Sequence, residues 1–112
     1  MEKLDYKFYA EILKIKDGDT AKVLVDLGFS VFCIQSIRIK GLNAPELNKS
    51  EESKAGKASR DYLMTLLPVG SKVLIKTEKY RQSFTRYVGD IYREDGSNVA
   101  ELLVAAGHAV KV

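Results

Sequence analysis

The sequence contains one cysteine, Cys33, among its 112 residues. A lone cysteine excludes an internal disulfide, and no other residue supplies a thiolate cluster for a metal. Cys33 lies in an alternating apolar stretch, so we expect a buried and unreactive thiol. The sequence also has no run close to the roughly 20 apolar residues that a membrane helix needs. We therefore expect neither a disulfide partner nor a membrane partner.

Histidine is equally scarce, since His108 is the only one. It follows the predicted end of a helix and is given no role, which excludes any mechanism that depends on a histidine base. The first ten residues mix both charge signs and lack the apolar segment of a signal peptide. We expect a cytoplasmic protein, or a secreted one if a leader has been trimmed from the chain.

What the sequence does contain is enough for one folded unit. Hydrophobic residues make up 46% of the chain, and this length suits a single domain over residues 1–112 with its own core. No internal repeat, low-complexity tract or linker interrupts it. The net charge of +3 is compatible with a nucleic-acid partner, although many other proteins share it.

Alternating apolar residues predict strands over residues 6–16, 20–27, 29–40, 72–80 and 84–92. In the second of these, Ala21, Val23, Val25 and Leu27 share one face. The segment Asp17-Gly18-Asp19 predicts a hairpin turn, because Asp-Gly tolerates the positive φ that such turns use. After the third strand, the chain is expected to turn through Gly41 and Asn43.

Helical spacing of apolar residues predicts a helix over residues 55–67, which Pro68 ends. A second, short helix follows the capping pattern of Asn98 and Glu101, with Gly107 as its C-cap. Three strands, a helix, two strands and a helix predict a β-rich α+β fold, a five-stranded OB-type barrel with helices that cap its apolar openings. The alternative is an open α+β sheet with both helices on one face.

Two of the predicted turns carry oxygen donors. Asp19 lies in the first hairpin turn, and Asn43 and Glu46 follow the third strand. In such a meander both turns can reach the same end of a barrel, where these oxygens would suit a hard cation such as calcium or magnesium. Arg38 and Arg86 could then bind a phosphodiester and offset the charge that develops at phosphorus.

Each of these motifs also has a simpler interpretation. An Asp-Gly-Asp segment is usually only a hairpin, and single arginines on strands are usually solvated or ion-paired. Tyr80, Tyr87 and Tyr92 could stack on bases, or they could pack within the sheet. The functional interpretation therefore depends on the combination.

That combination is "DGDT", then "IRIKGLNAPE", a helix, "FTR" and "IYREDGSNVAELLVAAGHA". It resembles the staphylococcal (micrococcal) nuclease family, also called thermonuclease-like, from about Phe8 to the C-terminus. The resemblance implies the same OB-type barrel. It also implies a calcium-dependent nuclease that hydrolyses DNA and RNA phosphodiester bonds with little sequence preference and leaves 3′-phosphate ends.

The resemblance also assigns roles to individual residues. Asp19 would be a side-chain ligand of one calcium ion, with Asn43 in the position of the second carboxylate ligand and Ala44 contributing its backbone carbonyl. Glu46 would activate or orient the attacking water, and Arg38 and Arg86 would bind the phosphate. DNA, RNA or both are the expected partners, and we expect a monomer.

Three departures from the family pattern affect this interpretation. Asn43 replaces the usual aspartate, so calcium should bind weakly. Phe84 lacks the phenol of the usual tyrosine, although its ring could still stack on a nucleotide. The family fold usually continues beyond the position of Val112, so this is either a minimal member or a shortened one. The alternative function is a catalytically impaired, nuclease-like module that binds nucleic acid or another protein.

Overall fold

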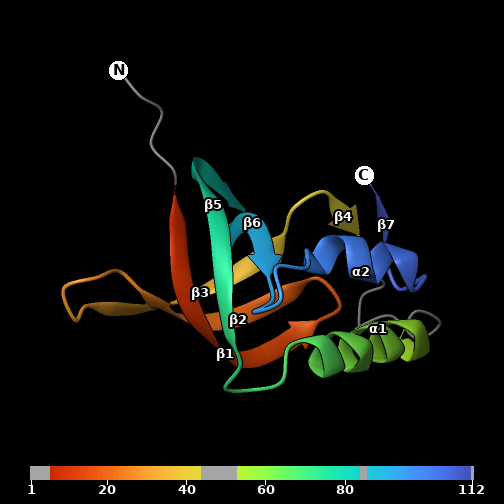
Figure 1. Ribbon diagram of the computed structural model, residues 1–112. Coiled ribbons are helices and arrows are strands. Elements are labelled where there is room, and N and C mark those ends of the chain that lie inside the picture. Colours follow the sequence, from red (N-terminus) through yellow and green to blue (C-terminus); the bar gives the residue numbers. More distant parts are fainter. Residues whose placement is uncertain (1–5, 44–52, 84–85, 112) are drawn as a thin grey trace.

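The computed structural model describes residues 6–43, 53–83 and 86–111. Five strands close into a barrel in the order β1-β2-β3-β6-β5, and Figure 1 shows this arrangement. The strands are β1 (Lys7–Asp17), β2 (Thr20–Asp26), β3 (Phe32–Ile39), β5 (Lys72–Ser83) and β6 (Arg86–Tyr92). The predicted OB-type barrel is confirmed, and the open sheet is excluded because β3 and β6 pair and close it.

The two predicted helices are also present. Helix α1 (Ser53–Leu66) ends just before Pro68, as the sequence indicates. Asn98 is the N-cap of helix α2 (Val99–Ala105), and its side-chain oxygen accepts a hydrogen bond from the Ala100 backbone N–H at 2.8 Å. Gly107 then adopts φ 78°, the left-handed conformation typical of the residue that follows a helix.

Inward-facing side chains of the strands meet side chains of both helices in one core. Alternation sets the pattern: Ile37 and Ile39 are buried, while Arg38 between them is only partly covered. The largest fully buried apolar side chains of this core are Ile12, Val23, Ile37, Ile39, Leu63, Leu67, Ile75, Ile91, Val99 and Leu103. Burial of so many branched side chains is the main contribution to the stability of the barrel.

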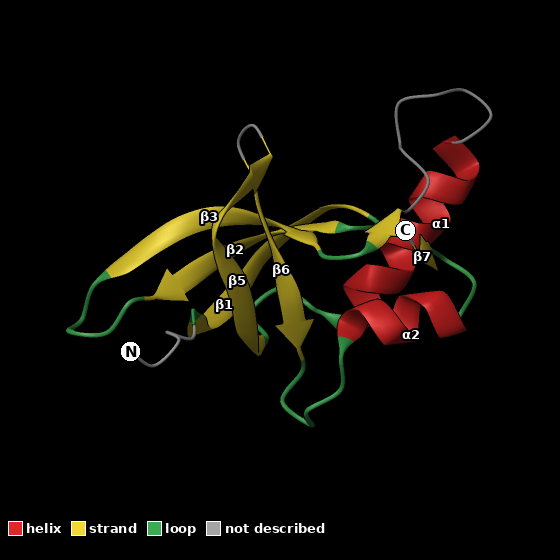
Figure 2. Cartoon of the chain, turned by 90° about the horizontal axis from the view of Figure 1, so that it is seen from above, coloured by secondary structure: helices red, strands yellow, loops and turns green. Residues whose placement is uncertain are grey.

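Both helices lie at the same end of the barrel (Figures 1 and 2). The sequence led us to expect helices over both openings, and this detail is wrong. The opposite opening is lined by apolar groups that include Phe8, Val25 and Cys33. Cys33 is half-buried there, so it is less enclosed than expected. Neither helix of the described chain is long and apolar enough to cross a bilayer.

The hairpin between β2 and β3 differs from the prediction. β3 begins at Phe32 because Gly28, Phe29 and Ser30 have φ values of 81°, 56° and 60° and form the turn. The turn closes through hydrogen bonds from the Leu27 N–H to the Val31 carbonyl and from the Val31 N–H to the Gly28 carbonyl. Leu27 therefore lies beyond β2, and it is exposed.

A short strand pair was not predicted. β4 (Leu42–Asn43) pairs antiparallel with β7 (Val110–Lys111), and Asn43 lies opposite Val110. Asn43 is thus in a strand and not in a turn. This pair joins the segment that follows β3 to the C-terminal end of the described chain.

Candidate active site

Asp19 lies in the turn between β1 and β2, and backbone hydrogen bonds hold that turn at the end of β3. The Asp19 N–H donates to Asp17 Oδ1 at 3.1 Å, while the Asp19 carbonyl accepts from the Ile39 N–H at 2.8 Å. The predicted hairpin is confirmed, because Asp17 pairs with Thr20 across it. Gly18 does not have the positive φ that we expected, and the Asp17 side chain stabilises the turn. The turn therefore places Asp19 beside the C-terminal end of β3.

Asp19 is buried, with 7% of the residue and 11% of its side chain exposed. Thr20 Oγ1 donates to its Oδ1 at 3.1 Å. Arg38 Nη2 lies 3.6 Å from its Oδ2, and 31% of the Arg38 side chain is exposed. The contact follows from the strand register, because Thr20 and Arg38 are directly opposite in the β2–β3 ladder. A buried carboxylate and a partly exposed guanidinium thus meet at one end of the barrel.

Burial raises the pKa of Asp19 from its ordinary value of 3.8 to about 6. The neighbouring Asp17 carboxylate raises the pKa further, whereas Arg38 and the Thr20 hydroxyl lower it without offsetting the rise. Burial and the neighbouring Asp17 carboxylate thus disfavour the ionised form of Asp19 at this position. The residues present therefore fit a bound cation, because a divalent ion would stabilise the ionised form that burial disfavours.

The raised pKa predicts how stability changes with pH in the absence of metal. The folded protein holds the Asp19 proton up to about pH 6, whereas the ordinary value of 3.8 applies to the unfolded chain. The folded state therefore binds more protons in this window, and the free energy of unfolding should decrease as pH rises through it. The decrease is at most roughly 3 kcal/mol, at about 1.4 kcal/mol per pKa unit.

Urea unfolding in chelator over this pH range measures the effect, with Asp19→Asn as the control. The wild type should lose stability relative to the variant as pH rises, because the amide does not titrate. A constant difference between the two proteins from about pH 4 to pH 6 would contradict the prediction.

Arg86 is placed by the parallel pairing of β3 and β6. Arg86 lies opposite Ser36, and Arg38 lies opposite Val88. The two arginine positions are therefore on neighbouring strands, two residues apart in register. The side chain of Arg86 is outside the described part of the structure.

The register also reveals cations that the sequence analysis missed. Lys14 lies opposite Lys22, Lys22 opposite Ser36, and Ser36 opposite Arg86. Three basic residues therefore share one cross-strand row beside the row that contains Arg38. Alternation along β2 shows that the Lys22 side chain faces outward, and the pairing of β2 with β1 and β3 shows which residues lie beside it. These two signals together could have identified Lys22 as part of a basic row. Such a row favours an anionic ligand on the outer face of β2 and β3.

The other predicted site residues cannot be placed as fully. The backbone of Asn43 is described, but its side chain is not. Ala44, Glu46 and Phe84 lie outside the described residues. The structure thus places Asp19 in the β1–β2 turn, beside Arg38 of β3, and it places the backbone of Arg86 on the adjacent strand β6. The roles assigned to all of these residues stay predictions.

His108 has structural contacts and lies near α1. The Ser59 hydroxyl donates to the His108 backbone carbonyl at 3.0 Å, and the imidazole stacks on Tyr62 with 4.6 Å between ring centroids. These contacts attach the end of α2 to α1.

Comparison with known proteins gives the family. The profile of the staphylococcal nuclease homologue family matches residues 36–112. Endonuclease YhcR of Bacillus subtilis (strain 168) is 34% identical over 104 residues, which cover 86% of this chain but 8% of that protein. Proteins named as uncharacterized endonucleases from Escherichia coli O157:H7 and Escherichia coli are each 31% identical over 101 residues, 90% of this chain and 59% of theirs. With its closed barrel and this match, the chain belongs to the staphylococcal nuclease homologue family.

Proposed function

We propose that this domain is a calcium-dependent nuclease that hydrolyses phosphodiester bonds of DNA, RNA or both and leaves 3′-phosphate ends. The observation that carries the proposal is the buried Asp19 side chain beside Arg38, at a place where burial and the Asp17 carboxylate disfavour its ionised form. The row of basic residues on the adjacent strands supports an anionic substrate. The relatives named as endonucleases support the same class of reaction.

Calcium would be held by the Asp19 carboxylate, the Asn43 amide oxygen and the Ala44 carbonyl. When bound, the ion would neutralise part of the negative charge of the phosphate. Arg38 and Arg86 bind the phosphate oxygens and stabilise the charge that builds on them. Glu46 accepts a proton from the water that attacks phosphorus, the bond from phosphorus to the 5′ oxygen breaks, and the departing oxygen takes a proton from solvent. The products are a 3′-phosphate and a 5′-hydroxyl end.

Asn43 should weaken this site. An amide oxygen can coordinate calcium but brings no negative charge, and calcium affinity rises with ligand charge. Asp19 would then be the single carboxylate ligand, and occupancy would need calcium at about millimolar concentration.

The test is a calcium titration of cleavage with single-stranded DNA as substrate. Cleavage should rise with calcium into the millimolar range and stop when chelator is added. End-group analysis of the products should find 3′-phosphates. Absence of cleavage at saturating calcium, with the protein folded, would overturn the proposal.

The missing charge at Asn43 also favours a second candidate. A domain of this family that has lost a metal carboxylate could bind nucleic acid, or another protein, without cleaving anything. In the titration above, DNA binding without cleavage at any calcium concentration would identify this function.

A further inference from the structure

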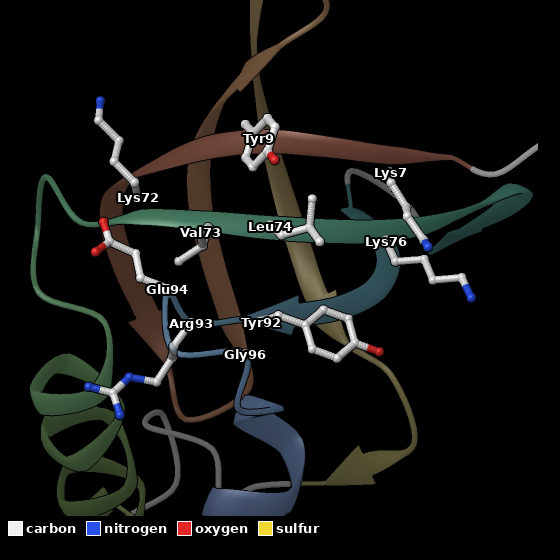
Figure 3. A pocket seen from close by; sticks show the side chains of 10 residues that line it. All are labelled: Lys7, Tyr9, Lys72, Val73, Leu74, Lys76, Tyr92, Arg93, Glu94 and Gly96. Atoms are coloured by element: carbon white, nitrogen blue, oxygen red, sulfur yellow. The ribbon is translucent and has the colours of Figure 1, made fainter.

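A groove of about 650 Å³ runs over the outer face of β1, β5 and β6, and Figure 3 shows the side chains that line it. It is separate from the candidate active site. In the barrel order β1-β2-β3-β6-β5, the groove is centred on β5, whereas Asp19 and Arg38 lie on the β2 and β3 side. The mechanism proposed above uses none of its residues.

Aromatic rings form the middle of this groove. Tyr9 lies opposite Leu74 in the β1–β5 ladder, and Leu74 lies opposite Tyr92 in the β5–β6 ladder. The three side chains therefore form one row across three strands, with the two tyrosines about 10 Å apart at two strand spacings. Tyr9 is 74% exposed, so its ring presents a large apolar face to solvent.

A row with two lysines lies beside the row of rings, two residues further along the strands. Lys7 and Lys76 are direct cross-strand partners, and they lie side by side in Figure 3, next to Tyr92. Asp90 of β6 is the acidic neighbour of Lys76 in this row. Side chains directly opposite each other in a ladder are close neighbours, so both ammonium groups can reach one bound phosphate.

The other end of the groove is less available to an anion. Lys72 forms an ion pair with Glu11, and Glu94 is at the rim beside it (Figure 3). Arg93 donates from Nε to the Leu66 carbonyl at 3.1 Å and lies 3.9 Å from Asp95. Lys7 and Lys76 are the lysines that lie in the row next to Tyr9 and Tyr92, so they are the better placed to contact phosphates of a strand stacked on those rings.

We propose that this groove binds single-stranded nucleic acid, with bases stacked on Tyr9 and Tyr92 and the backbone phosphates at Lys7 and Lys76. Successive outward residues of a strand are about 7 Å apart, so the lysine row lies roughly one nucleotide from the tyrosine row. Rings interleaved with cations are the usual arrangement for strands bound without sequence preference. An acidic peptide would use the lysines but has no flat bases for the rings.

Such a site would hold a strand on the side of the barrel away from Asp19. If the domain is the nuclease proposed above, a long substrate engages both sites and gains affinity that a short one lacks. The binding itself does not depend on cleavage. It can therefore be measured in chelator, where failure of the nuclease proposal has no effect on the result.

The test measures fluorescence anisotropy of a labelled oligothymidylate of about twelve nucleotides, and of an abasic strand of equal length. Replacing both tyrosines, Tyr9→Ser with Tyr92→Ser, should weaken oligothymidylate binding roughly ten-fold or more and leave abasic binding unchanged. The variants Tyr9→Phe and Tyr92→Phe keep the rings and should bind as the wild type does. Tyr9→Ser alone, at an exposed position, should give part of the loss even if the double variant does not fold.

The charge test uses Lys7→Glu with Lys76→Glu, matched against Lys57→Glu on the exposed surface of α1. The double variant Lys7→Glu with Lys76→Glu should weaken binding of both the oligothymidylate and the abasic strand. It should also reduce the salt dependence of binding, because two phosphate contacts are lost. A single charge reversal at Lys57 should change little. The proposal would be overturned if the Tyr→Ser variants bound oligothymidylate as tightly as the wild type, or if they lost as much affinity for the abasic strand. It would also be overturned if Lys57→Glu lost as much affinity as the variant of Lys7 and Lys76. Tyrosine-independent binding of oligoglutamate in place of DNA would indicate an acidic protein partner and would overturn it too.

Discussion

Replacing Glu46 with glutamine should slow the cleavage of single-stranded DNA at saturating calcium by about a hundred-fold or more. Glutamine keeps the size and polarity of the side chain but cannot accept a proton from the attacking water. The turnover number should therefore fall, whereas the affinity for DNA, which depends on the arginines, should change little. Single-turnover cleavage, with DNA binding measured separately in chelator, distinguishes the two quantities.

Glu101→Gln is a suitable control for this variant. Glu101 is exposed on α2, and the same chemical change there should leave the rate almost unaltered. Equal rates for Glu46→Gln and the wild type would remove Glu46 from the mechanism.

Replacing Asn43 with aspartate should lower the calcium concentration for half-maximal cleavage by about ten-fold or more. The change adds a second carboxylate to a site that otherwise relies on Asp19. Each formal charge on a ligand increases the attraction for a divalent ion, and the effect is large where water is partly excluded. A calcium titration of activity, supported by calorimetric calcium binding, measures it.

Asn98→Asp makes the same charge change at the start of α2 and should leave the calcium requirement as it is. The introduced carboxylate would still accept the hydrogen bond that the Asn98 side chain accepts from the Ala100 N–H, since aspartate caps helices as well as asparagine does. If Asn43→Asp shows no change in calcium dependence, the side chain at this position does not face the metal.

The fold was largely predictable because its signals are local. Alternation around Ile37, Arg38 and Ile39 indicates which side chains face the core, and Pro68 indicates where the first helix ends. The β4–β7 pair could not be predicted in this way. It joins two short segments far apart in the sequence, and neither Asn43 nor Val110 belongs to a run long enough to show a period.

The candidate site was predictable in part for the same reason. Asp19 and Arg38 stand in recognisable motifs, and their contact follows from the register of one hairpin. Lys22 belongs to no motif, and its place in a basic row needs the pairing of four strands. Tyr9 and Tyr92 come from distant parts of the chain and lie in one row, on either side of Leu74 in β5. Such rows depend on long-range register, which local patterns do not specify.

The parallel pairing of β3 and β6 has a consequence for how the two candidate functions are related. One interstrand step and two residue steps separate the backbone positions of Arg38 and Arg86, a diagonal of about 8 Å that is comparable to the distance between successive phosphates of a strand. Main-chain hydrogen bonds between β3 and β6 fix that spacing. If Glu46 activates the water and the two arginines bind phosphates as proposed, loss of Glu46 would leave the arginine spacing unchanged, so hydrolysis could be lost in evolution while binding of the sugar-phosphate chain is kept.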